Sequence, residues 1–168
     1  YNDFLNKYQL SRHCIGLSGM VFTEADIEQL AGRIRKMKET GTHLCCSIGF
    51  LTEKQARMLK DAGLDRINHN LNSSRNYYSH ICTTHTFDQR VENIHMLQRI
   101  GFEICSGGII GMGERKEDVV DMLLELTEIN PEALPINFLL PLPVTPIGTQ
   151  DVYALTYAYG MKVLCIAR

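Results

Sequence analysis

Short apolar runs alternate along the chain with longer segments in which apolar residues recur at helical spacing. The first such segment begins at Thr23 with a Thr-Glu-Ala-Asp capping sequence, and Ile27, Leu30 and Ile34 follow on one face. The pattern predicts five strands, at residues 12–18, 43–49, 64–70, 102–105 and 135–140. The predicted helices are 23–40, 52–62, 87–99, 116–129 and 152–168, and an irregular polar stretch runs from 71 to 86.

Five consecutive strand–helix units predict a parallel sheet covered by helices. Two architectures fit that order, an open doubly wound sheet and a (β/α)8 barrel. A complete barrel takes about 250 residues, so five units would form part of one. The first strand is not followed by a dinucleotide-binding glycine fingerprint, which counts against the open sheet. We therefore expect an α/β fold that is a partial TIM-type barrel, with residues 1–168 in a single domain.

Composition narrows the classes of protein further. The net charge is -2 and like charges do not cluster, which argues against a nucleic-acid partner or an anionic membrane surface. The chain has no apolar run of about 18 residues, so we expect no membrane span. Its six cysteines form no C-x-x-C pair and suit a reducing, cytoplasmic setting. Because the chain begins Tyr1-Asn2-Asp3, without an initiator Met, we expect a piece of a longer protein.

The segment from Cys105 to Glu114 carries four glycines after a short apolar run. Glycine lets a backbone turn tightly and approach a neighbouring group closely. We therefore interpret the segment as a strand end that opens into a ligand-contacting turn. The spacing is neither that of a dinucleotide fingerprint nor that of a P-loop. An ordinary glycine-rich connection is the alternative.

Polar residues fall in or just after the predicted strands, mostly towards their C-terminal ends. Parallel strands bring those ends together on one face, which is where barrel active sites lie and which favours the barrel. Thiolates from separate strands suit zinc or an iron–sulfur cluster, and carboxamides suit a urea, a ribose or an amide. A polar barrel mouth with inert, buried thiols is the other interpretation. The polar residues in or just after the strands are Cys14, Cys45, Asn68, Asn70, Cys105 and Asn137. The thiols concerned are Cys14, Cys45 and Cys105, and the carboxamides are those of Asn70, Asn72 and Asn137.

Several motifs follow one another along the chain. They are Asn68-His69-Asn70-Leu71-Asn72-Ser73-Ser74, Ile81-Cys82-Thr83-Thr84-His85-Thr86, Arg90, Cys105 to Glu114, and Pro135-Ile136-Asn137-Phe138-Leu139. In this order the motifs resemble those of the biotin synthase family, and the resemblance covers nearly the whole chain.

The resemblance implies a radical S-adenosylmethionine enzyme on a (β/α)8 barrel, which inserts sulfur into dethiobiotin to form biotin. It implies a 4Fe–4S cluster that cleaves S-adenosylmethionine and an auxiliary cluster, commonly 2Fe–2S, that supplies the sulfur. It also implies a homodimeric parent protein.

Residue roles follow from the same resemblance. Cys14, Cys45 and Cys105 match ligands of the auxiliary cluster, while Cys46 does not, and strand alternation turns it away from Cys45. Asn70 and Asn137 match residues near the ureido ring and the cosubstrate, and Asn72 matches a ribose contact. Arg90 matches the partner of the methionyl carboxylate, with a surface arginine near Glu92 and Glu103 as the alternative. Ile109 and Leu140 match adenine contacts, and His69 is expected to be a packed structural residue.

Two parts of the family pattern are missing from this chain. The C-x-x-x-C-x-x-C motif for the 4Fe–4S cluster does not occur before Cys14, and the arginine that is the fourth auxiliary ligand would follow Arg168. We therefore expect the 168-residue piece alone to be inactive. The alternatives are a related radical enzyme of the hydrogenase-cofactor or methylornithine type, and a non-catalytic nucleotide-binding remnant.

Overall fold

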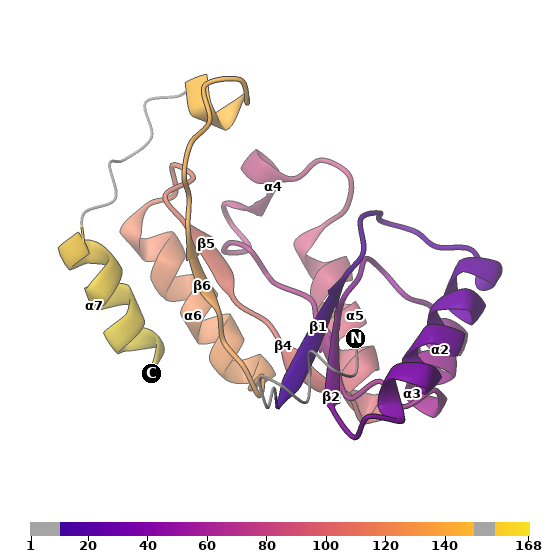
Figure 1. Cartoon of the computed structure of the whole chain (residues 1–168). Helices are drawn as coiled ribbons and strands as arrows, with labels where there is room; N and C mark the ends of the chain where they lie inside the picture. Colours follow the sequence, from indigo (N-terminus) through magenta and orange to yellow (C-terminus); the bar gives the residue numbers. More distant parts are fainter. Residues whose placement is uncertain (1–10, 150–156) are drawn as a thin grey trace. The chain divides into compact units, whose positions relative to one another are not determined.

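The computed structural model describes residues 11–149 and 157–168, and within them parallel strands alternate with helices in an α/β fold (Figure 1). The chain divides into two compact units, which are described separately. The first contains the residues up to His69 together with Glu92–Ile104, and the second contains Asn70–Val91 and the residues from Cys105 on. The α/β class is confirmed, and the assignment of residues 1–168 to one domain stays a prediction.

The strands of the first unit run parallel in chain order. They are β1 (Arg12–Gly16), β2 (His43–Ser47) and β3 (Arg66–Asn68), followed in the sheet by β4 (Glu103–Cys105). The register pairs Cys14 with Cys45 and Cys46 with Ile67. Each strand is shorter than predicted: β1 and β2 end two residues earlier, β3 is shorter by two residues at each end, and β4 begins one residue later.

Two helices of the first unit begin with reciprocal caps, and the cap at Thr23 was predicted from its Thr-Glu-Ala-Asp sequence. In α2 (Glu24–Lys38), Thr23 Oγ1 accepts from the Asp26 N–H at 3.2 Å, and the Asp26 carboxylate accepts from the Thr23 N–H at 2.9 Å. Thr52 and Gln55 form the same arrangement at α3 (Glu53–Asp61). The helices lie side by side next to β1 and β2 (Figure 1). The core beneath them contains the fully buried Ile27, Ile34, Leu44, Leu59 and Ile67.

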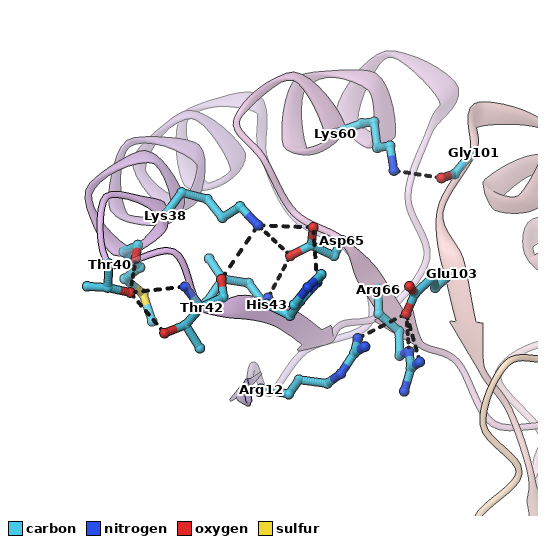
Figure 2. A network of polar contacts seen from close by, with 12 residues as sticks. Arg12, Lys38, Thr40, Thr42, His43, Lys60, Asp65, Arg66, Gly101 and Glu103 are labelled. Atoms are coloured by element: carbon cyan, nitrogen blue, oxygen red, sulfur yellow. Dashed lines mark hydrogen bonds and ion pairs between the residues drawn. The ribbon is translucent and has the colours of Figure 1, made fainter. Parts of the chain in front are cut away.

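Ion pairs join the segments at which the strands of the first unit begin (Figure 2). Asp65 Oδ2 accepts from Lys38 Nζ at 2.8 Å and from the Leu44 N–H at 2.7 Å. Partial burial would raise the pKa of Asp65, but these hydrogen bonds and the charge of Lys38 outweigh it and lower the pKa. Glu103 Oε2 likewise accepts from Arg12 Nη1 at 3.0 Å and from Arg66 Nε at 2.9 Å.

The second unit is built around β5 (Gly108–Ile110) and β6 (Ile136–Phe138), which pair in parallel. Its core includes the fully buried Leu71, Ile110 and Met122. Its helices are α4 (Tyr78–Ile81), α6 (Lys116–Ile129), the 3-10 turn η1 (Ile147–Thr149) and α7 (Tyr157–Ala167), while α5 (Phe87–Ile100) begins here and ends in the first unit.

Three sequence expectations differ from the structure of the second unit. The glycine segment was expected to be a turn, but Gly108–Ile110 is a strand because it pairs with β6. The polar stretch was expected to be irregular, but it contains the short helix α4. Residues 152–156 of the predicted last helix lie outside the described residues, and α7 begins at Tyr157. Among the described residues, no helix is both long and apolar enough to cross a membrane.

Candidate functional site

Two segments that carry predicted site residues are bonded to each other in the second unit. Asn70 Oδ1 accepts from the Gly107 N–H at 3.1 Å. The Asn72 N–H donates to Gly107 O at 3.0 Å, and the Ile109 N–H donates to Asn72 O at 2.9 Å. Asn72 has a positive φ of 71°, a conformation in which asparagine is more common than most residues. The structure thus holds both asparagines against the glycine segment.

Glycine is required at the first two glycine positions of that segment, because other atoms of the chain lie very close to the backbone there. A Cβ on Gly107 would lie 1.8 Å from Pro135 O, and one on Gly108 would lie 2.1 Å from Met122 Sδ. Neither position has room for a side chain. The immediate neighbours of these two glycines are a backbone carbonyl before β6 and a side chain of α6, and the ligand contact of the segment stays a prediction. Their role in the structure is to let β5 pack.

The second half of the segment is a turn held by its own carboxylate. Glu114 is buried, and its Oε1 and Oε2 accept from the N–H groups of Gly111 and Met112, both at 2.7 Å. The Tyr77 hydroxyl donates to Met112 O at 3.0 Å. Gly111 and Gly113 have φ of 96° and 102°, so the turn needs residues that tolerate left-handed backbone. Glu114 is therefore a structural residue of this turn.

The register of β5 and β6 places two further predicted residues opposite each other. Ile109 pairs with Asn137, and the Leu139 N–H donates to Ile110 O at 2.9 Å just beyond the strands. Asn137 and Leu140 are exposed, whereas Ile109 is half-buried. A polar amide and an apolar side chain thus lie side by side on the paired strands.

Arg90 is half-buried and lies within a cluster that the sequence did not indicate. Its Nε donates to the Tyr78 hydroxyl at 2.7 Å, and its Nη2 lies 2.6 Å from His85 Nε2. Cys82 Sγ lies 3.5 Å from His85 Nδ1. His85 belongs to the motif at residues 81–86 that was matched by resemblance, but nothing in that motif indicates its contact with Arg90.

The thiols differ in exposure and acidity. Cys14 is exposed, and its register partner Cys45 is buried. Burial, with a smaller contribution from Cys14, raises the pKa of Cys46 to about 12, so that thiol keeps its proton. Cys105 is half-buried at the end of β4, in the second unit.

No group of three or more His, Cys, Asp or Glu side chains within residues 11–149 and 157–168 is arranged to hold a metal ion. The three-cysteine ligand set stays a prediction. His69, by contrast, is buried with its ring edge-on to Phe50 at a centroid distance of 5.2 Å, which confirms its packed role.

Comparison with known proteins identifies the class. Residues 3–126 match the Radical SAM superfamily, and the chain belongs to that superfamily. Membership implies S-adenosylmethionine and a 4Fe–4S cluster as cofactors.

Among individual relatives, the chain is similar to biotin synthases. It is 39% identical over 159 residues to biotin synthase of Sulfurihydrogenibium sp., an alignment that covers 94% of this chain and 47% of that protein. The biotin synthase of Aquifex aeolicus is 42% identical over 164 residues, with 96% of this chain and 49% of the relative covered. The chain therefore spans about half the length of the curated relatives it matches.

Solved structures share the fold. Methylornithine synthase superposes with a TM-score of 0.75 at 15% identity, over 95% of this chain and 49% of that one. The FeFe-hydrogenase maturase from Carboxydothermus hydrogenoformans gives a TM-score of 0.75 at 14% identity, over 98% and 41%. At these identities the likeness concerns the fold alone.

Proposed function

We propose that the protein to which this chain belongs is a biotin synthase, a sulfurtransferase that converts dethiobiotin to biotin with S-adenosylmethionine. The observation that carries the proposal is the identity of 39% to a biotin synthase across 94% of the chain. The bonded arrangement of Asn70, Asn72 and Gly107 supports it, because it holds together two of the segments on which the resemblance rests.

We assign the cosubstrate contacts to residues of the second unit. The Arg90 guanidinium carries a permanent charge and several N–H donors, which suit the methionyl carboxylate. The Asn72 carboxamide offers a donor and an acceptor to the ribose hydroxyls. Ile109 and Leu140 offer apolar surface to the adenine, and the 80% exposure of Leu140 means that binding would remove that surface from water.

Two other asparagines are assigned to the substrate. Asn70 Oδ1 accepts from the Gly107 N–H, so the Nδ2 hydrogens of Asn70 are the ones suited to meet a ureido carbonyl oxygen. Asn137 is exposed beside Ile109, where an amide can donate to and accept from a urea group.

Cys14, Cys45 and Cys105 are assigned as ligands of the auxiliary cluster, which we expect to be of the 2Fe–2S type. Thiolates are the ligands that such clusters require, and Cys14 and Cys45 are register partners on adjacent strands. Cys46 fits less well, because its pKa of about 12 disfavours the thiolate. When bound, the auxiliary cluster would supply the sulfur atom, and S-adenosylmethionine with the 4Fe–4S cluster would supply the radical chemistry.

The setting of the parent protein is part of the proposal. We propose a cytoplasmic homodimer, in line with the biotin synthase resemblance and with free cysteines that suit a reducing compartment.

Anaerobic reconstitution of the full-length protein with iron and sulfide tests the proposal. We expect biotin to form from dethiobiotin and S-adenosylmethionine. Cys105→Ala should abolish biotin formation and the visible absorption of the auxiliary cluster, while binding of S-adenosylmethionine persists. Cys46→Ala is the matched control, and it should keep both the cluster and the activity. A wild-type protein that binds S-adenosylmethionine but forms no biotin contradicts the proposed activity, and a fully active Cys105→Ala variant contradicts the ligand assignment.

A further inference from the structure

The contacts around Arg90 determine which atoms carry protons. A guanidinium only donates, so His85 Nε2 must accept from Arg90 Nη2 at 2.6 Å. The proton of a neutral His85 is then on Nδ1, which lies 3.0 Å from Thr84 Oγ1 and can donate to it. The Tyr78 hydroxyl accepts from Arg90 Nε at 2.7 Å, and it also lies 2.8 Å from His85 Nε2, whose single ring lone pair the Tyr78 hydroxyl would have to share with Arg90. Two acceptors side by side thus fix one edge of the guanidinium, the edge formed by Nε and Nη2.

The charge states agree with this arrangement. Burial first, and the charge of Arg90 second, lower the pKa of His85, so the imidazole is neutral at physiological pH. Arg90, Tyr78 and Cys82 are titratable groups in contact with His85. Burial raises the pKa of Tyr78 in spite of Arg90, so the phenol also stays neutral. These two acceptors therefore orient the guanidinium without cancelling its charge.

The elements that carry these side chains are themselves fixed. Tyr78 is 3% exposed, and its ring packs edge-on against Phe87 at a centroid distance of 5.5 Å. Thr86 and Gln89 exchange hydrogen bonds of 2.9 and 3.1 Å, which define the start of α5 one turn before Arg90. A long side chain held in this way loses less conformational freedom when it binds an anion.

We propose that Tyr78 and His85 are positioning residues that hold the Arg90 guanidinium in the plane in which it binds the carboxylate of S-adenosylmethionine. The proposal rests on the proposed function, because that function supplies the carboxylate. It goes further by assigning roles to two residues outside the cosubstrate contacts.

Equilibrium binding to the reconstituted full-length protein tests the proposal with two ligands. One is S-adenosylmethionine, and the other is 5′-methylthioadenosine, which lacks the amino acid carboxylate. Tyr78→Phe and His85→Leu should each weaken S-adenosylmethionine binding about tenfold, the equivalent of one charge-assisted hydrogen bond. Binding of 5′-methylthioadenosine should not change. His85→Gln retains an acceptor near the position of Nε2 and should restore most of the affinity.

A pH series separates positioning from packing. Wild-type affinity for S-adenosylmethionine should fall when the pH drops through the lowered pKa of His85, which lies below the ordinary value of about 6.5, because an imidazolium cannot accept from Arg90. His85→Gln should show no such fall, and circular dichroism should show that each variant is folded.

Three results would overturn the proposal. The first is that His85→Leu and Tyr78→Phe bind S-adenosylmethionine as tightly as the wild type does. The second is that these variants lose affinity equally for S-adenosylmethionine and for 5′-methylthioadenosine. The third is that the affinity of His85→Gln depends on pH as that of the wild type does. If the wild type binds S-adenosylmethionine and the variants behave as expected but no biotin forms, the positioning role stands and the sulfur-insertion activity is wrong. Failure of the wild type to bind S-adenosylmethionine would overturn both.

Discussion

Replacing Asp65 by Asn removes the negative charge that faces Lys38 (Figure 2). The same carboxylate accepts from the Leu44 N–H. Asparagine can still accept from the Leu44 N–H, but as a neutral bond, which costs about 1 kcal/mol relative to a charge-assisted one. The ion pair with Lys38 is also lost. Its side chains are 30% and 24% exposed, so solvent screens it only in part, and we assign it about 1 kcal/mol. The free energy of unfolding should fall by about 2 kcal/mol at neutral pH.

The effect should depend on pH in a definite direction. The pKa of Asp65 is lowered in the folded protein, so its contribution is fully present above the unfolded value of about 3.9 and is lost as pH falls through the folded value. The difference between wild type and Asp65→Asn should therefore shrink as the pH approaches about 3. This difference in the free energy of unfolding is measured by urea titrations of the full-length protein at several pH values, followed by circular dichroism.

The matched control is the exposed ion pair of Glu24 with Lys54, at 2.6 Å. Both side chains are about two-thirds exposed, at 66% and 67%, so Glu24→Gln should change the unfolding free energy by less than about 0.5 kcal/mol. The account of the Asp65 network is wrong if Asp65→Asn lowers the free energy of unfolding no more than Glu24→Gln does. It is also wrong if the decrease caused by Asp65→Asn is the same at low pH as at neutral pH.

Two further changes test the packing and the thiols. Gly107→Ala should lower the free energy of unfolding, measured in urea, by about 3 kcal/mol or more, because its Cβ would lie 1.8 Å from Pro135 O. Gly32→Ala is the control. Its Cβ would meet nothing within 4 Å, so it should stabilise α2 slightly. Equal stabilities for the two variants would contradict the close-approach argument. In the protein without its clusters, iodoacetamide at about pH 8 should alkylate the exposed Cys14 but not the buried Cys46, whose pKa of about 12 leaves a thiolate fraction of about 10⁻⁴. Rapid labelling of Cys46 in the folded protein, read by mass spectrometry, would refute its burial.

The helices could be predicted from the sequence because their signals are local. Thr23 and Thr52 each stand three residues before the side chain that completes the cap, and α6 (Lys116–Ile129) has the bounds that were expected. The α/β order followed from the alternation of these helices with apolar runs.

Features that depend on distant residues could not be predicted in this way. Gly108–Ile110 is a strand because residues 136–138 pair with it, and nothing in the glycine sequence itself indicates that partner. Arg90 was singled out by resemblance, but its contacts with Tyr78 and His85 depend on the path of the chain through α4 and the loop after it. The loop carries no periodicity from which that path could be inferred.

The backbone and the side chain of Asn72 have separate roles. Its N–H and C=O make the bonds to Gly107 and Ile109, so the attachment of this segment does not use the carboxamide. The left-handed backbone restricts the position to glycine, asparagine, aspartate and a few others. Within that short list, the chemistry offered to a ligand can change while the scaffold stays the same. Substitutions at this position can therefore alter ligand preference without an equal loss of stability.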